Sequence, residues 1–292
     1  MSDLGKLLAL WAQECEQQDA DCWNLALTNG AAMAVTARRD QGFLLLDADA
    51  GVSPAPELLA PLAERAHQLP AAVKFALRGP HDLRLRAEVP LPDGGSPEAG
   101  RVREHLDGMR SASHQLRDWL SREAAGTEVA CPEPQGEGQA NPGSMTELLS
   151  EAGWQYHERP GGALLADLEA GSQFLQAAVE RCGAGARFHL TLYRHDAPGD
   201  TAWQALCLYL LEANATLRYA RAFVRRQGEA IEAGFEVRME TGPSAAETGH
   251  ALAALSVAGR HCAREMEVLK DGAVAGIYRS ARLPASHQIK GD

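Results

Sequence analysis

The residues best suited to acid–base chemistry are two adjacent pairs, His81-Asp82 and His195-Asp196. An aspartate can orient a histidine that acts as a general base. Adjacent side chains in a strand or turn generally point apart, however, and no nucleophile stands at a spacing that would complete a catalytic triad. We therefore expect no catalytic residue, and we interpret both pairs as parts of turns between elements.

The acidic pair Asp47-Ala-Asp49, at the end of a predicted strand, has the residue types that can bind a divalent cation, and a second Asp-Ala-Asp occurs at 19–21. The same pattern is common in turns, where aspartates accept backbone N–H groups. His250 and His261 are eleven residues apart on one predicted helix, about 16 Å, which is too far to share one metal. We expect neither a metal nor a cofactor.

The six cysteines form neither a zinc motif nor a Cys-x-x-Cys redox pair, and we expect free, mostly buried thiols. They are Cys15, Cys22, Cys131, Cys182, Cys207 and Cys262.

The nearest fragment of a dinucleotide-binding motif is Gly183-Ala-Gly185. It lies between two predicted strands rather than opening a helix, so we interpret it as a hairpin turn.

The chain of 292 residues has a formal net charge of −11 at pH 7. Binding to nucleic acid or to an anionic membrane requires clustered Lys and Arg, so this charge argues against both. Hydrophobic residues make up 45% of the chain, but no apolar run approaches the ~18 residues that span a bilayer. The polar N-terminus lacks a signal-peptide pattern, and we expect a cytoplasmic protein.

A stretch rich in Gly, Pro, Gln and Glu, residues 123–144, has almost no apolar periodicity and is predicted to be a flexible linker. It separates two parts of similar size. We predict a first domain at 1–122, a second domain at 145–283 and a tail at 284–292.

The same strand pattern occurs once in each part. Five apolar residues alternate with polar ones in Leu83–Leu91, and again, at one constant offset, in Ile231–Met239. This period of two predicts a strand with one buried face. Arg84 and Arg86 fall on the polar side of the first strand. We interpret them as solvated salt-bridge partners, with a small basic face as the alternative.

The remaining elements also follow one order in both parts. Each strand leads through a Gly/Pro/Ser turn into a helix, at 97–122 and at 244–270, and Ser244 can cap the second helix. We predict short helices at 4–13 and 145–152, strands at 23–27, 31–37, 42–47, 154–158, 162–168, 174–181 and 187–194, and central helices at 56–74 and 201–226. Because strands and helices do not alternate strictly, the fold is predicted to be α+β, with two tandem copies of an antiparallel sheet packed with helices.

The segment from Phe75 to Met109 resembles the pattern of YbjN-like proteins, and residues 222–268 repeat it more loosely. It has an apolar residue before a tight turn, an alternating strand that ends in a Pro-containing turn, and an amphipathic helix. The element order is also similar to the fold of class I type III secretion chaperones. The resemblance implies a non-enzymatic, protein-binding role without catalytic or cofactor residues. Two copies on one chain imply an internal pseudo-dimer, which leaves open whether the chain is monomeric or forms a homodimer.

Apolar strand residues are the candidates for holding an extended segment of a partner protein. Most must be core, but an apolar second face of a sheet would suit an added peptide. The candidate peptide-binding residues are Leu25, Leu27, Met33, Val35, Leu164, Phe174, Leu190 and Leu192. The function hypothesis is a protein- or peptide-binding chaperone or adaptor. The alternative is a small-ligand-binding protein or enzyme that uses the cleft between the two domains.

Overall fold

The computed structural model describes residues 3–28, 32–52, 55–70, 72–91, 95, 97–124, 142–228 and 230–283. The described residues form two sheets of six antiparallel strands, packed with seven α-helices. The predicted linker falls largely on residues 125–141, and the predicted tail on 284–292. Both lie outside the described residues.

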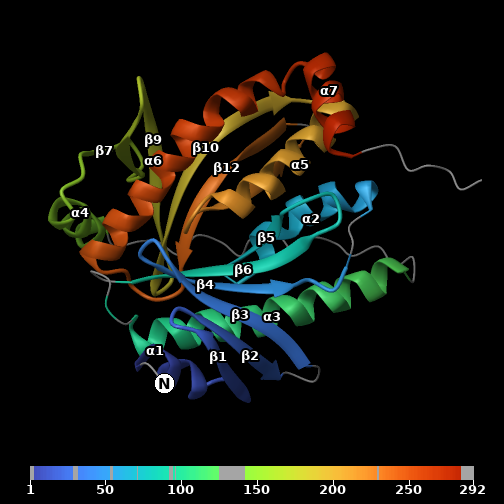
Figure 1. Cartoon of the computed structure of the whole chain (residues 1–292). Helices are drawn as coiled ribbons and strands as arrows, with labels where there is room; N and C mark the ends of the chain where they lie inside the picture. The colour runs from blue at the N-terminus through green and yellow to red at the C-terminus, as the bar shows by residue number, and fades with distance from the viewer. Residues whose placement is uncertain are drawn as a thin grey trace, which may run out of the picture.

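Sheet 1 contains every strand that precedes the long helix of the first half, in the order β1-β2-β3-β4-β6-β5. Its strands are β1 (Glu14–Asp19), β2 (Cys22–Thr28), β3 (Ala32–Asp40), β4 (Phe43–Asp49), β5 (Val73–Leu77) and β6 (Leu83–Pro90). Its helices are α1 (Asp3–Ala9), α2 (Leu59–Arg65) and α3 (Ala99–Ala124). The long helix α3 lies along the sheet (Figure 1) and packs against β6 and β5.

Sheet 2 has the matching order β7-β8-β9-β10-β12-β11. Its strands are β7 (Tyr156–Glu158), β8 (Leu164–Ala170), β9 (Gln173–Cys182), β10 (Gly185–Asp196), β11 (Arg221–Gln227) and β12 (Ala230–Met239). Its helices are α4 (Pro142–Glu151), α5 (Asp200–Thr216), α6 (Ala245–Val268) and α7 (Gly272–Arg282). The two sheets therefore share one topology, in which the fifth strand of each half forms an edge beside the sixth. The predicted α+β fold with two sheet-containing halves, arranged as a pseudo-dimer, is confirmed.

The alternating strands bury the side chains that their period predicts. In β6, Leu83, Leu85 and Ala87 are buried, and in β12 the residues Ile231 and Phe235 are buried as well. Helix α6 packs mainly against β10 and β8. It begins with a capping box: Ser244 accepts the N–H of Glu247, and the Glu247 carboxylate accepts the N–H of Ser244. The predicted cap at Ser244 is thus confirmed.

Both central helices are shorter than predicted. The first is a 3₁₀ turn at Pro56–Leu58, α2, and a second 3₁₀ turn that ends at Gln68, after which β5 begins at Val73. The helical region ends before Pro70, the residue that the sequence predicts to shorten or kink this helix, because proline has no N–H to continue it. The second helix, α5, ends at Thr216, and the prediction of helix at 221–226 is wrong. Tyr219 has a φ of 63°, which no right-handed helix contains, and β11 follows.

The sequence pattern also missed β1. This strand, Glu-Cys-Glu-Gln-Gln-Asp, is mostly exposed and pairs only with β2 at the outer edge of sheet 1. Because Cys15 is the one residue of this strand that is partly buried against the core, the strand carries no alternation of apolar and polar residues. No helix among the described residues combines the length and the apolar character needed to cross a membrane. The cytoplasmic location stays a prediction.

Gly234 of β12 lies close to the backbone of β10. A Cβ at this position would lie 2.0 Å from the Leu190 carbonyl oxygen and 3.0 Å from the Cα of Thr191. We expect Gly234→Ala to lower the free energy of unfolding by about 2 kcal/mol or more, because backbone must move to relieve the overlap. Gly79→Ala, where a Cβ meets no atom within 4 Å, should change it by less than about 0.5 kcal/mol. Urea unfolding would measure both, and equal stabilities would contradict this account.

Candidate functional site at the junction of the two halves

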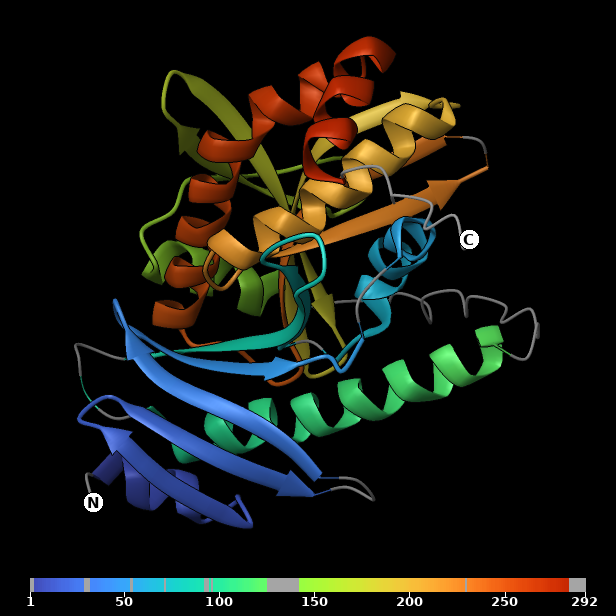
Figure 2. The same ribbon diagram turned by 45° about the vertical axis from the view of Figure 1, so that its right-hand side comes forward.

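The two halves meet through their inner edge strands and central helices. Helix α5 packs against β5 and α2, and α2 packs against β11, so α2 and α5 lie side by side between the sheets (Figures 1 and 2). Asn214 of α5 is fully buried and joins both edges. Its amide donates to the Phe75 carbonyl at 2.8 Å, and its side-chain oxygen accepts the Ala222 N–H at 2.7 Å. The junction is therefore specified by polar as well as apolar contacts.

A buried lysine of the first half holds the end of α5. The Lys74 ammonium lies 2.9 Å from the Glu88 carboxylate and donates to the carbonyls of Leu217 at 2.7 Å and Ala220 at 3.0 Å. Lys74 and Glu88 are only 2% and 4% exposed. Burial lowers the pKa of Lys74, and the Glu88 carboxylate counteracts part of this effect. The three acceptors match the three N–H donors of the ammonium, and its charge lies where the helix dipole is negative.

Arg86 acts on the same end of α5. It binds the Asp47 carboxylate at 2.8 Å and donates to the Ala215 carbonyl. Burial alone would raise the pKa of Asp47, but hydrogen bonds from Arg84 and Arg86 and the charges of Arg86 and Arg78 outweigh it and hold that pKa below its usual value. Arg84 and Arg86 are thus salt-bridge partners as predicted. The expectation that they are solvated is wrong for Arg86, which is buried because α5 covers this face of sheet 1.

A buried cation of the second half likewise binds backbone carbonyls of the first half. Arg221 of β11 lies 2.8 Å from Glu236 of β12, and it donates to the carbonyls of Leu69, Pro70 and Val73. These carbonyls follow the last turn of the α2 region. Glu88 and Glu236 occupy the same place in the repeated strand pattern, and each is a buried carboxylate that pairs with a cation reaching across to the other half.

Glu236 is bound by two arginines. Besides Arg221, Arg187 of β10 lies 2.6 Å from its carboxylate. Burial would raise the pKa of Glu236, but the charges and hydrogen bonds of Arg221 and Arg187 outweigh it and lower the pKa to about 2. The Glu236 carboxylate is therefore ionised at neutral pH.

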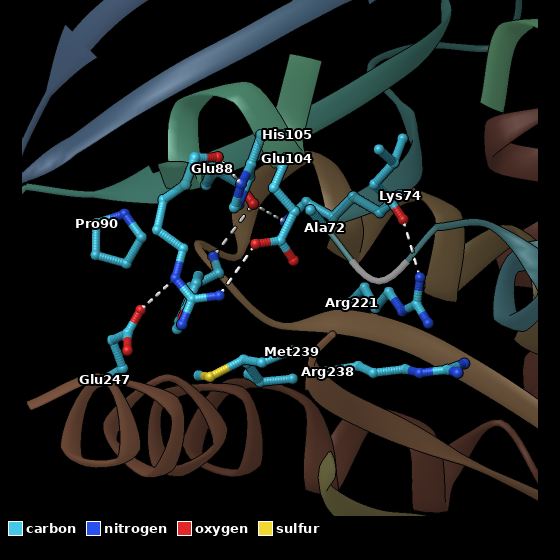
Figure 3. A pocket seen from close by; sticks show the side chains of 14 residues that line it. Ala72, Lys74, Glu88, Pro90, Glu104, His105, Arg221, Arg238, Met239 and Glu247 are labelled. Carbon is cyan, nitrogen blue, oxygen red and sulfur yellow. Dashed lines mark hydrogen bonds and ion pairs between the residues drawn. The ribbon is translucent and has the colours of Figure 1, made fainter. Parts of the chain in front are cut away.

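A small pocket opens beside these pairs (Figure 3). Among its lining residues, Arg101, near the start of α3, binds Glu247 of α6 at 2.7 Å and Glu104 at 3.0 Å, and it also donates to the Thr241 hydroxyl. His105 lies deeper. Its Nδ1–H donates to the Arg101 carbonyl at 2.7 Å, and burial lowers its pKa against the opposing effect of that hydrogen bond. The histidine is therefore held neutral.

The pocket is the cleft that the alternative function would require, because polar groups from both halves converge on it. The volume of the pocket is about 30 Å³, whereas a cavity that holds one buried water needs about 10–15 Å³. Drug-sized ligands occupy sites of roughly 300–1,000 Å³. One oxygen of Glu88, Oε1, has no hydrogen-bond partner, which suits a bound water. The charged side chains that line the pocket pair with one another and so join the two halves.

The eight predicted peptide-binding residues differ in how far they are exposed to solvent. The six buried in the core beneath the helices are Leu25, Leu27, Met33, Val35, Leu164 and Leu190. A peptide could not touch these six unless the core opened, because the apolar face of each sheet is the one its helices cover. Leu192 is half-buried against the core, and Phe174 is 83% exposed at the start of β9. Binding of a peptide to these residues stays a prediction.

The remaining candidates from the sequence do not converge. Asp47 is occupied by arginines, His195 Nδ1 hydrogen-bonds to the neighbouring Asp196 carbonyl, and His250 and His261 are exposed on α6. Among the described residues, no three His, Cys, Asp or Glu side chains lie close enough together to hold a metal ion. The described cysteines are free thiols.

Sequence reasoning missed the residues that matter most at the junction, Lys74, Glu88 and Arg221. Lys74 was assigned to a helix, and Glu88 was assigned to a polar, solvent-facing side of its strand. One pattern could have marked them: Glu88 and Glu236 stand at equal positions in the two alternating strands, each between apolar residues. A charge repeated at the same place in both halves indicates a shared structural partner.

Comparison with known proteins bears on the second half. Comparison with curated proteins and with solved structures gave no significant match. Residues 141–267, which run from the start of α4 to nearly the end of α6, match the model of the YbjN family, described as "putative bacterial sensory transduction regulator". The second half of this chain is thus similar to the YbjN family, as the sequence resemblance implied for that part.

Proposed function

We propose that this chain is a non-enzymatic protein-binding protein of the regulator, adaptor or chaperone kind, and that it works without a metal or cofactor. The similarity of residues 141–267 to a regulator family supports this role. The ionisable groups at the junction support it too, because they pair with one another across the two halves. A secretion-type chaperone, built from two tandem copies of one ancestral module, is the more specific form of this proposal.

The observation that carries the proposal is the position of the exposed apolar side chains. The large apolar side chains left exposed in the described residues are Leu10, Phe174, Val257, Val268, Val274 and Ile277. All but Leu10 lie in the second half, and four of them lie on the consecutive helices α6 and α7. Isolated exposed apolar residues are common on any surface, but a concentration on neighbouring elements is typical of a protein-binding surface.

The partner is another protein or an extended peptide. The net charge of −11 disfavours nucleic acid and anionic membranes. Because the halves already pair within one chain, the protein is either a monomeric pseudo-dimer or a homodimer of such units, and it acts in the cytoplasm.

The proposal predicts that a partner from the native host is lost when the α7 surface is made polar. Full-length protein, Val274→Asp/Ile277→Asp and the control Leu10→Asp would each be used for affinity purification from that host, with quantitative mass spectrometry. We expect at least tenfold less of a specific protein with the α7 variant and unchanged recovery with Leu10→Asp, because each buried Ile or Val contributes about 1.5–3 kcal/mol. Recovery of no specific protein by the unaltered chain would count against the proposed function.

A further inference from the structure

Helix α3 places one histidine ring, that of His105, in the pocket between the two halves (Figure 3). The residue is 7% exposed. Its Nδ1–H donates to the Arg101 carbonyl at 2.7 Å, so Nε2 of the neutral ring carries no hydrogen. Histidine is the side chain whose ordinary pKa, about 6.5, lies closest to neutral pH. A modest fall in pH can therefore change the charge at this place in the junction.

Charged side chains from both halves line the same pocket, and each carboxylate among them already has a cationic partner. Glu88 of β6 binds Lys74 of β5 at 2.9 Å. Arg101 binds Glu104 of its own helix at 3.0 Å and Glu247 of α6 at 2.7 Å. The other titratable or charged groups that line the pocket are Tyr219, Arg221 of β11 and Arg238 of β12. A second proton on the ring would thus add a positive charge where every lining carboxylate is already paired.

The closed pocket favours the neutral form of the His105 ring. Burial lowers the pKa of His105 below its ordinary value of 6.5, and the charge of Arg101 adds to this effect. The hydrogen bond to the Arg101 carbonyl and the charges of Glu104 and Glu88 oppose it without cancelling it. If the pocket opens to water, the pKa of the ring returns toward 6.5. The open form then binds the proton more readily, so a fall in pH through this range favours opening.

We propose that His105 makes the junction of the two halves acid-responsive, so that uptake of one proton by its ring shifts the chain toward a form in which the pocket is open. A protonated ring that stayed in the pocket would draw a carboxylate from its present partner. Loss of Glu104 would disturb Arg101, the cation that binds α6. Loss of Glu88 would disturb Lys74, the cation that holds the end of α5. The response is a property of the chain alone and requires no binding partner.

A second histidine with little exposure, His189 of β10, lies outside this pocket. Its ring meets the edge of the Phe223 ring with 5.9 Å between centroids, and its Nδ1 lies 3.8 Å from the Glu180 carboxylate. Burial lowers its pKa as well. Because these contacts all lie within sheet 2, we expect His189 to affect the stability of that sheet and not the opening of the junction.

Hydrogen exchange measured by mass spectrometry on the full-length chain tests the proposal. Peptides that cover residues 217–224 report on the junction, because the Tyr219 N–H donates to Glu88 of the other half. Peptides that cover 32–40 report on the remote strand β3. Uptake of one proton by His105 can raise the opening equilibrium at most about tenfold between about pH 7.5 and 5.5. After correction for intrinsic exchange rates, we expect a rise of at least about threefold at 217–224 and less than about 1.5-fold at 32–40.

His105→Asn separates the proton from the hydrogen bond. Asparagine offers an N–H donor for the Arg101 carbonyl and carries no charge at any pH. In this variant we expect the acid-induced rise at 217–224 to fall below about 1.5-fold. The matched control His114→Asn replaces an exposed histidine of the same helix and should keep the full rise. His189→Asn should keep it as well.

An NMR titration of the His105 ring in the unaltered chain keeps the test decisive if His105→Asn does not fold. A midpoint clearly below 6.5, together with the rise at 217–224, supports the proposal. A midpoint at or above 6.5 would overturn it, because the closed pocket would then accept the charged ring, with the unpartnered Oε1 of Glu88 as its acceptor. An opening equilibrium that does not rise with acid, a rise that survives in His105→Asn, or a rise that disappears in His189→Asn would also overturn it.

Discussion

Replacing Lys74 by methionine should lower the free energy of unfolding by about 3–5 kcal/mol, because the change leaves the Glu88 carboxylate buried without its partner. It also removes the donors to the Leu217 and Ala220 carbonyls, so the end of α5 loses two of its hydrogen bonds to sheet 1. Urea unfolding at pH 7 measures the change. The exposed pair Lys6–Asp3 is the control: Lys6→Met should cost less than about 0.5 kcal/mol.

The double variant separates the charge from the capping contacts. In Lys74→Met/Glu88→Gln no buried charge is left unpaired, so we expect recovery of more than half of the loss seen with Lys74→Met alone. The part that is not recovered measures the hydrogen bonds to α5. A single variant as stable as the unaltered chain, or a double variant no more stable than the single one, would show that the pair does not hold the junction.

Glu236→Gln should remove an acid-sensitive contribution to the free energy of unfolding. The pKa of Glu236 is lowered from 4.5 to about 2 in the folded chain. A carboxyl whose pKa is depressed by folding stabilises the fold above its unfolded pKa, and this contribution is lost as the pH falls through the folded pKa. The contribution, about 3 kcal/mol, is therefore present at pH 7 and declines between about pH 4.5 and 2.

The stability of the unaltered chain and of Glu236→Gln would be compared in urea at several pH values between 7 and 2.5. At pH 7 we expect the variant to be less stable by about 3–5 kcal/mol, since Arg221 and Arg187 then lack their carboxylate. Toward pH 2.5 the difference should shrink steadily. A difference that stays constant with pH would mean that Glu236 is not the ionised centre of this cluster.

The junction explains how two halves of similar topology form one pseudo-dimer. In each half a buried carboxylate, Glu88 or Glu236, pairs with a cation, Lys74 or Arg221, that also binds carbonyls at the end of the other half's helical region. Neither half can satisfy these groups alone. The outer helices α6 and α7 remain available to a partner, so the arrangement separates the residues that assemble the chain from the surface proposed for binding.

The sequence by itself determined the strands and helices that have a strong local pattern. The alternation in Leu83–Leu91 and Ile231–Met239 identified β6 and β12, the Gly/Pro/Ser turns and Ser244 located the long helices, and the order of elements indicated α+β. These features depend on residues close in the chain, because side-chain periodicity and capping act within a few residues. The inner face of each strand could be predicted for the same reason.

Only the tertiary structure decided what covers the second face of each sheet. Period-two alternation tells which side chains share a face, but it does not tell whether solvent or another half lies against the polar one. Lys74 and Arg86 proved buried because α5, more than 120 residues away in the chain, ends on them. Leu25 and Leu190, proposed as peptide contacts, proved buried because helices cover them. Pairings over such separations are set by how the halves pack, and local sequence does not encode that packing.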